Sequence, residues 1–251
     1  MTNKRKDVVD DGSSDPKKKK VADDASSSDG KKKKGKANEL GIILNKSAER
    51  ERYDKLAGRG IILSRYPDKT TLNALGIIEN VRILVGNIGW GTFLGCKYST
   101  YEYLTLEFLS TLCFTKDKYN VDDPEHTVPF SLGNKDFSMS LTQFCERMGF
   151  ASTGLIHESR NQNTKPENYD PDDFWRRISR RRKYVAKSAK ASSIHNPVFR
   201  YIHRVMACSI LGRKETGTVR TDELFMLWAM VNKCQVNTGY YLLSHMAPVA
   251  A

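Results

Sequence analysis

Paired cysteines of the kind that bind metals or carry out redox chemistry are absent from this chain of 251 residues. Its five cysteines lie far apart and form no C-x-x-C pair, which excludes a zinc ribbon and a thioredoxin-like motif. They are Cys96, Cys113, Cys145, Cys208 and Cys234. Because most of them stand among apolar residues, we expect reduced thiols in the core of an intracellular protein.

Long apolar runs are lacking as well. No stretch approaches the roughly 20 apolar residues of a membrane-spanning helix. The first residues are charged where a secretory signal would have an apolar region. We therefore expect no membrane partner and a location in the nucleus, or also in the cytoplasm.

Enzyme motifs are missing too. The glycines at 86, 89, 91 and 95 match neither G-x-G-x-x-G nor G-x-x-x-x-G-K-[ST], so we interpret them as a turn. Residues 119–123 (YNVDD) are one residue too long for the metal-binding turn of a reverse transcriptase. Residues 10–14 (DDGSS) lack the order of an aspartic protease motif, and no zinc knuckle is present.

The five histidines form no clear metal or catalytic pattern. His203 is interpreted as a partly exposed helix residue, because its spacing to His195 and Cys208 matches no known ligand set. A nucleophile pair of Cys145 with His126 or His157 stays open, although nothing favours it over core packing. We expect no enzyme activity, no metal site and no cofactor.

Apolar residues are scarce in the first 38 positions, which hold three residues of the Leu, Ile, Val and Phe group. Such a segment buries too little apolar surface to offset chain entropy, so we predict a disordered tail over 1–38. Residues 1–36 carry 12 Lys and Arg against 7 Asp, a net charge of +5, and the whole chain carries +12. A balance this basic favours phosphate-rich partners.

Two runs of four lysines dominate the tail. They are Lys17, Lys18, Lys19, Lys20 and Lys31, Lys32, Lys33, Lys34. Their ten-residue spacing is typical of a bipartite nuclear import signal, which would make an import receptor a partner. The alternatives are that the lysines hold the phosphates of nucleic acid, or that they only keep the tail in solution.

The rest of the sequence predicts a mainly α fold with one short β-hairpin, an α+β arrangement. In the first part, 39–157, a polar helix is expected over 45–57 and a buried helix over 72–88. A further helix over 100–114 would be capped by Ser99 and Glu102. Its apolar stripe would be Tyr101, Leu104, Phe108 and Leu112.

A hairpin and a second capped helix follow. Alternating apolar residues over 126–140 predict a hairpin that turns at Gly133 and Asn134. Ser140 and Gln143 form a capping box for a helix over 141–150.

Residues 158–171 are polar and are predicted to link this part to a helical C-terminal part, 172–251. Asp170 and Pro171 form a helix start, a capping residue followed by proline at the first helical position. We expect this helix to continue through the most basic stretch of the chain. That stretch contains Arg176, Arg177, Arg180, Arg181, Arg182, Lys183, Lys187 and Lys190.

These eight basic residues are the candidate nucleic-acid-binding residues. On one helix, five would share a face at steps of three and four: Arg176, Arg180, Lys183, Lys187 and Lys190. Trp175 and Tyr184 would lie nearby to stack on bases. The alternative is a solvated helix face paired with Asp172, Asp173 and Glu223.

A helical hairpin with a large apolar seam is predicted over 195–231. Its first helix begins at Pro197 and ends at Gly212, and Thr221 caps the second.

Residues 196–230 (NPVFRYIHRVMACSILGRKETGTVRTDELFMLWAM) resemble the first-open-reading-frame protein of Athila-type plant retrotransposons. FCERMGF at 144–150 and DDFWRRIS at 172–179 resemble it too, and the helix–hairpin–helix order of 99–150 is similar to that of related plant transposon proteins. The resemblance covers about residues 60–250 and leaves out the tail.

The resemblance implies a gag-like structural product, and the family has no established catalytic residues to carry over. We therefore expect a non-enzymatic, retrotransposon-derived protein that binds RNA or DNA and associates with itself. The alternative is a host nuclear protein that binds DNA or protein, or a remnant without function. The chain stops soon after Trp228, where the resemblance implies a longer domain, so we expect a truncated C-terminal part.

Overall fold

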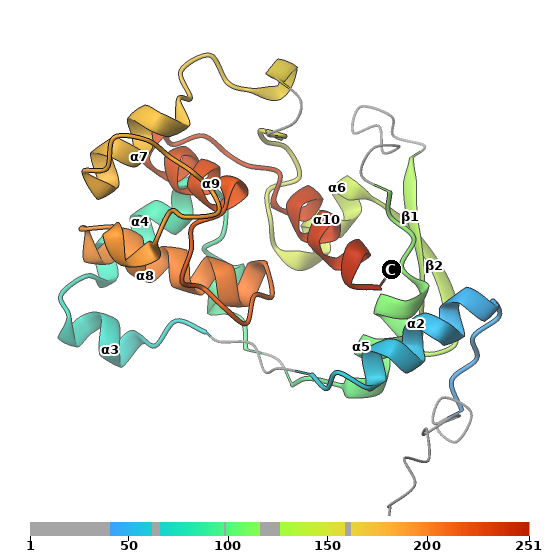
Figure 1. Ribbon diagram of the computed structural model, residues 1–251. Helices are drawn as coiled ribbons and strands as arrows, with labels where there is room; N and C mark the ends of the chain where they lie inside the picture. Colours follow the sequence, from blue (N-terminus) through green and yellow to red (C-terminus); the bar gives the residue numbers. More distant parts are fainter. Residues whose placement is uncertain (1–40, 62–65, 98, 116–125, 159–161, 251) are drawn as a thin grey trace, which may run out of the picture. The chain divides into compact units, whose positions relative to one another are not determined.

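The computed structural model describes residues 41–61, 66–97, 99–115, 126–158 and 162–250 (Figure 1). The predicted tail, with both lysine runs at 17–20 and 31–34, lies outside the described residues.

Helices make up most of the described chain. In order they are α2 Ser47–Ala57, α3 Lys69–Ala74, α4 Ile78–Asn87, α5 Glu102–Thr111, α6 Leu141–Met148, α7 Pro171–Ser179, α8 Pro197–Val205, α9 Thr221–Asn232 and α10 Thr238–Ala250. Strands β1 Thr127–Leu132 and β2 Lys135–Ser140 pair antiparallel. The predicted mainly α fold with one β-hairpin is confirmed.

The hairpin turns where the sequence predicts. Gly133 and Asn134 have φ angles of 62° and 60°, which suit a two-residue turn between twisted strands. The buried carboxylate of Glu107 on α5 accepts the N–H groups of Gly133 (2.7 Å) and Asn134 (2.8 Å). Helix α6 then begins at the predicted capping box of Ser140 and Gln143.

The helix predicted over 72–88 is in fact two helices. Gly76 has a φ of 63°, and this left-handed residue separates α3 from α4. Glycine adopts that conformation without the cost that a side chain would impose. Leu75, which the apolar period places in the core, is 59% exposed as a result.

Helix α5 also differs from its prediction. Tyr101 is its N-cap and gives no side-chain cap, so Ser99 does not cap this helix. Tyr101 and Leu104 are exposed. The helix instead turns Leu106 into a small core with α2, and Glu107 toward the hairpin.

The main core centres on α9, from which Leu224 to Met230 are all buried. Helices α4, α7 and α8 pack against it. Buried apolar residues from Leu72 to Leu243 form one cluster, and all the described residues fall in one unit, Lys34–Ala251. The parts before and after the polar segment 158–171 therefore share a core, and Tyr169 of that segment is buried in it.

The C-terminal helical hairpin follows its prediction except at one cap. Helix α8 begins at Pro197, continues as a π turn over Met206–Ile210, and gives way to Gly212 with a φ of 56°. Thr221 is not the cap of α9. Arg220 holds that position, and its N–H donates to the side chain of Glu223 (2.8 Å).

Cys145 and His157 are core residues. Cys145 lies against Gly239, and burial raises the pKa of its thiol to about 11. The ring of His157 packs on Tyr169 and Phe225, and burial lowers its pKa. A thiol that stays protonated is a poor nucleophile, so these contacts favour core packing over a catalytic pair.

Candidate nucleic-acid interface

Helix α7 holds the first part of the candidate interface, Arg176–Lys190, which we name the basic segment. Asp170 caps the helix by accepting the N–H groups of Asp172 (2.8 Å) and Asp173 (3.0 Å), and Pro171 is its first residue, as predicted. The apolar side chains Phe174, Trp175 and Ile178 are buried. This packing fixes the helix on the core and leaves its arginines outside.

The helix does not continue through the basic segment, so the prediction of one charged helical face is wrong. Helix α7 ends at Ser179, and Arg180 adopts a left-handed φ of 54°. The hydroxyl of Ser179 donates to the carbonyl of Trp175 (2.7 Å) and accepts from the N–H of Arg181 (3.2 Å). A longer helix would place Arg181 or Arg182 on the apolar side, and like charges three and four residues apart would destabilise it.

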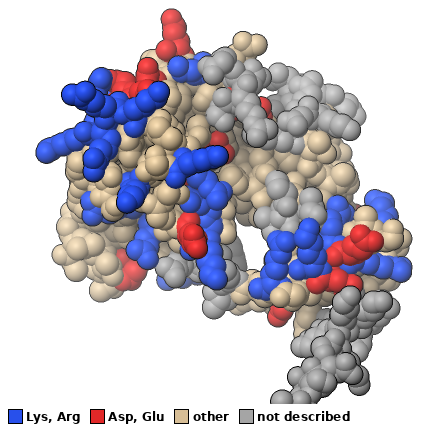
Figure 2. Space-filling model, viewed as in Figure 1, with Lys and Arg blue, Asp and Glu red and all other residues tan. Residues whose placement is uncertain are grey.

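The basic segment is instead a short helix end followed by a loop that keeps every predicted cation on the surface. All eight are exposed: Arg176, Arg177, Arg180, Arg181, Arg182, Lys183, Lys187 and Lys190. No acidic residue occurs between positions 176 and 190. Figure 2 shows Lys and Arg gathered over α7 and the chain after it, at the upper left of the view.

Part of this charge is neutralised within α7. Asp173 pairs with Arg176 and, at 3.1 Å, with the Nε of Arg177. Both arginine side chains remain 61% exposed, so these pairs contribute little to stability. Within the described part of the chain, the six cations from Arg180 to Lys190 form no ion pair, which leaves them available to a partner.

The predicted stacking residues are packed against each other, with Trp175 buried and Tyr184 partly buried. Trp175 is 2% exposed, and Tyr184 packs edge-on against it at 5.7 Å between ring centroids. The hydroxyl of Tyr184 donates to the carbonyl of Val219 (2.9 Å), and burial raises its pKa to about 12. Neither ring is free to stack on a base, so the interface offers charge alone.

Backbone contacts hold the end of the basic segment against the loop before α9. The N–H of Val219 donates to the carbonyl of Ala189 (2.8 Å), and the N–H of Ala191 donates to that of Gly217 (2.9 Å). Lys190 and Thr218 thereby form an isolated antiparallel bridge. The loop is therefore tied to the core at both ends, by Ile178 and by this bridge.

The structure also reveals a buried ionic group that sequence reasoning missed. Glu223 accepts from Arg213, and its Oε2 lies 2.9 Å from the Nε2 of His203. The three side chains are 0%, 7% and 1% exposed, so His203 is not the partly exposed residue that we predicted. Its helical spacing from Phe199, Met206 and Ile210 is the signal that could have placed it inside.

Hydrogen bonds to its carboxylate keep Glu223 ionised inside the protein. Burial alone would raise its pKa, but the hydrogen bonds from His203, the Arg220 N–H and Arg213 outweigh that effect, and the net pKa is lowered. Glu223 pairs with His203 and Arg213 inside the protein. It therefore does not neutralise the basic segment, as it would on a solvated helix face paired with acidic residues.

The described ranges contain no group of three or more His, Cys, Asp or Glu side chains placed to hold a metal ion. Nor do they contain a helix with the length and apolar character needed to span a bilayer.

Residues 27–236 match the family model described as the ATHILA ORF-1 family. The chain belongs to the ATHILA ORF-1 family. The match covers most of the chain, including the basic segment and the Glu223 group. No curated protein and no solved structure matches the chain.

Membership in the ATHILA ORF-1 family makes this a retrotransposon-derived protein. The family match begins at residue 27, whereas the resemblance in the sequence was expected to begin near residue 60, so the predicted extent is wrong. The second lysine run, 31–34, therefore lies inside the ATHILA ORF-1 region, while the first run lies outside it.

Proposed function

We propose that this ATHILA ORF-1 protein is a non-enzymatic, gag-like structural protein that binds nucleic acid through the basic segment. The supporting observation is the set of eight exposed cations in 15 residues without an intervening acid, on the last turn of α7 and the core-anchored loop after it. Arginine and lysine bind phosphate through charge and hydrogen bonds, and the release of counterions drives such binding.

The basic segment has no exposed aromatic side chain among its predicted stacking residues, and this determines how we expect it to bind nucleic acid. Since Trp175 is buried and Tyr184 packs against it, base stacking contributes nothing at this surface. Contacts to phosphates position a nucleic acid without reading its sequence. We expect little preference among base sequences and a strong dependence of affinity on salt.

A pair of charge-matched variants tests the binding surface. The segment variant replaces Arg181, Arg182, Lys183 and Lys187 with Gln and leaves the left-handed Arg180 in place. The control variant replaces four exposed cations elsewhere, Lys69, Lys97, Lys135 and Arg204, with Gln. At about 50 mM salt, the segment variant should bind single-stranded RNA at least about tenfold more weakly than the control variant. Equal affinities of the two variants would reject the basic segment as the interface.

The structural part of the proposal is that copies of the chain associate. Helix α5 begins with three exposed apolar side chains, Tyr101, Tyr103 and Leu104, which are 65%, 50% and 39% exposed. Neighbouring exposed apolar residues mark protein interaction surfaces, and tyrosine is enriched in them.

Light scattering on the full chain tests this association. The wild-type protein should exceed the mass of one chain, and the Tyr103→Ser, Leu104→Gln double variant should shift toward the monomer. Val231→Gln, on another helix and 40% exposed, is the control that should keep the wild-type mass. A strictly monomeric wild-type protein would reject the gag-like role.

The proposal also places the protein in the nucleus. Its support is the spacing of the lysine runs at 17–20 and 31–34, which suits an import receptor. Replacing Lys31, Lys32, Lys33 and Lys34 with Ala in a fluorescent fusion should move the signal to the cytoplasm. Unchanged nuclear accumulation would reject a bipartite signal.

A further inference from the structure

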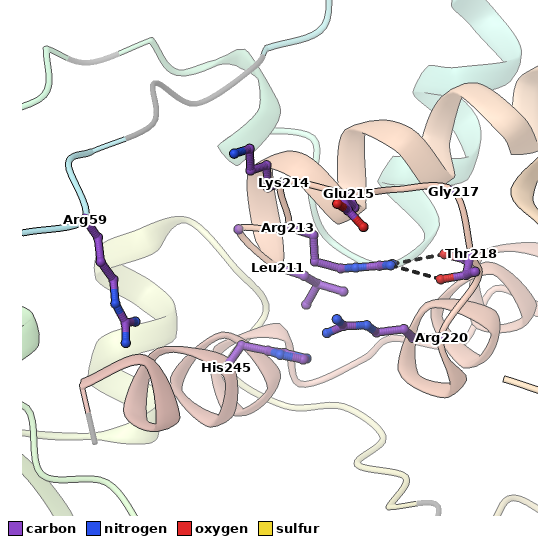
Figure 3. Close-up of a pocket in the computed structure, with 10 residues that line it drawn as sticks. Arg59, Leu211, Arg213, Lys214, Glu215, Gly217, Thr218, Arg220 and His245 are labelled. Atoms are coloured by element: carbon purple, nitrogen blue, oxygen red, sulfur yellow. Dashed lines mark hydrogen bonds between the residues drawn. The ribbon is translucent and has the colours of Figure 1, made fainter. Parts of the chain in front are cut away.

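A cavity of about 610 Å³ lies next to the far end of the basic segment, between the loop before α9, helix α10 and Arg59, the second residue after α2 (Figure 3). Its lining contains the charged residues Arg59, Arg213, Lys214, Glu215 and Arg220, and also His245. Figure 3 shows Arg220 and His245 pointing into the same space from opposite sides, with Arg59 approaching from a third. Three separate parts of the chain thus bring basic side chains to one cavity.

The floor of the cavity is a buried arginine in a fixed position. Arg213 is 7% exposed and pairs with Glu223, and its terminal nitrogens donate to the carbonyl (3.1 Å) and hydroxyl (3.2 Å) of Thr218. Its Nε is buried and has no hydrogen-bond partner among the described residues. That nitrogen is shielded from solvent, so a ligand in the cavity would meet the exposed lining cations Arg59, Lys214 and Arg220.

The charge of the cavity favours an anion. Glu223 balances Arg213, and Asp222 lies 3.4 Å from the Nε2 of His245. The remaining charged residues of the lining are three cations, Arg59, Lys214 and Arg220, and one acid, Glu215. In the described chain neither Arg59 nor Lys214 forms an ion pair, so these cations are open to a ligand.

We propose that this cavity is a phosphate-binding site, distinct from the exposed surface of the basic segment. Guanidinium groups match the geometry of phosphate oxygens and bind them through paired, charge-assisted hydrogen bonds, and Arg59 and Arg220 bring two such groups to the lining. The volume falls in the usual range for small-ligand sites, so the cavity admits a nucleotide-sized group. The ligand is either a free phosphate compound or the terminal phosphate of a nucleic acid.

The link to the basic segment makes a nucleic-acid end a natural source of that phosphate. Thr218, which lines the cavity, forms the β-bridge with Lys190, the last cation of the segment. A strand held along the segment would reach the cavity across this bridge. The phosphate site itself does not depend on that arrangement, since the cavity has its own cations.

Isothermal titration of the full chain with inorganic pyrophosphate at low salt tests the site. Binding should be measurable, and Arg220→Gln and Arg59→Gln should each weaken it by about tenfold, the effect of one charge-assisted hydrogen bond. Arg220 contacts Glu223 through its backbone N–H, so its side-chain substitution leaves the cap of α9 intact. Arg204→Gln, an exposed cation outside the lining, is the matched control and should bind like wild type.

Two further arms separate this proposal from the nucleic-acid interface and identify the source of the phosphate. The segment variant should keep its pyrophosphate affinity even if it loses RNA binding. A 5′-phosphorylated oligonucleotide that binds more tightly than its 5′-hydroxyl form, with the difference removed by Arg220→Gln, supports a nucleic-acid end. Equal binding of the two oligonucleotides alongside pyrophosphate binding supports a free phosphate compound. Absence of pyrophosphate binding, or equal losses in Arg220→Gln and Arg204→Gln, would overturn the site.

Discussion

The Nε2 of His203 on α8 lies 2.9 Å from the Oε2 of Glu223 on α9, and both side chains are shielded from solvent. Arg213 pairs with the other carboxylate oxygen of Glu223. This group joins the two helices of the C-terminal hairpin and fixes the loop that lies beside the basic segment. It links the stability of the core to the position of the surface that we propose binds phosphate.

Removing Glu223 should be costly for this reason. Glu223→Ala leaves the buried Arg213 without its counter-charge, and losing one partner of a buried pair typically costs about 3–5 kcal/mol of stability. Urea denaturation measures the change in the free energy of unfolding. Glu215→Ala, at an exposed acid on the same loop, should change it by less than about 0.5 kcal/mol. Similar small losses in both variants would contradict a structural role for the group.

The ionisation of Glu223 should make the stability of the protein depend on pH. The folded-state pKa of Glu223 lies below its ordinary value of 4.5. Its contribution is therefore fully present above pH 4.5 and is lost as the pH falls through the lowered folded-state pKa. Below pH 4.5 the unfolding free energy of wild type should fall more steeply than that of Glu223→Gln. Parallel curves for the two proteins would show that Glu223 does not titrate in this way.

Gly154 should tolerate no side chain. Its φ is 153°, and an added Cβ would lie 2.6 Å from the carbonyl carbon of Val236, where Leu155 bonds to the backbone of Gln235. We expect Gly154→Ala to lower the unfolding free energy by about 1–3 kcal/mol. Gly86→Ala, on α4 with open space around it, is the control and should be neutral or stabilising. Equal melting temperatures of the two variants would contradict the close approach.

The cysteines should differ in reactivity according to their burial. Cys145 is fully buried with a thiol pKa of about 11, whereas Cys113 is exposed. Since the thiolate is the reactive form, iodoacetamide at neutral pH should label Cys113 well before Cys145. Mass spectrometry of digested protein measures the two rates. Comparable labelling of Cys145 in the native protein would reopen a role for it as a nucleophile.

Local rules predicted the elements whose ends depend on neighbouring residues. The hairpin turn at Gly133 and Asn134, the capping box at Ser140, and the helix start at Asp170 all rest on contacts within four residues. The failures arise where distant contacts decide. The end of α7 at Ser179 is such a case, because the helix is held by Phe174, Trp175 and Ile178 against the core and the basic residues after it are not. The break at Gly76 is the exception: its cause is local, but the apolar period continues across it.

For the candidate site, the sequence was sufficient to identify the charged residues but not their arrangement. The cations of the basic segment can be read directly from the sequence, and all of them are exposed in the structure. The spacing of Phe174, Trp175 and Ile178 on one side of α7 indicates a buried face, and the packing of α7 against α9 confirms that Trp175 belongs to it and not to the binding surface. The Glu223 group and the cavity lined by Arg59 and Arg220 join residues far apart in the chain, so they become visible only in the folded structure.

The salt dependence of RNA affinity tests the central claim most directly. If the basic segment neutralises about five phosphates of a single strand, log K should fall with log salt at a slope of roughly −3.5 between about 50 and 200 mM. Fluorescence anisotropy with a labelled single-stranded RNA measures this slope for each protein. The segment variant should have a slope shallower by roughly 2.8, and the control variant should stay within roughly 0.7 of wild type. Equal slopes for the segment and control variants would contradict phosphate binding by Arg176–Lys190.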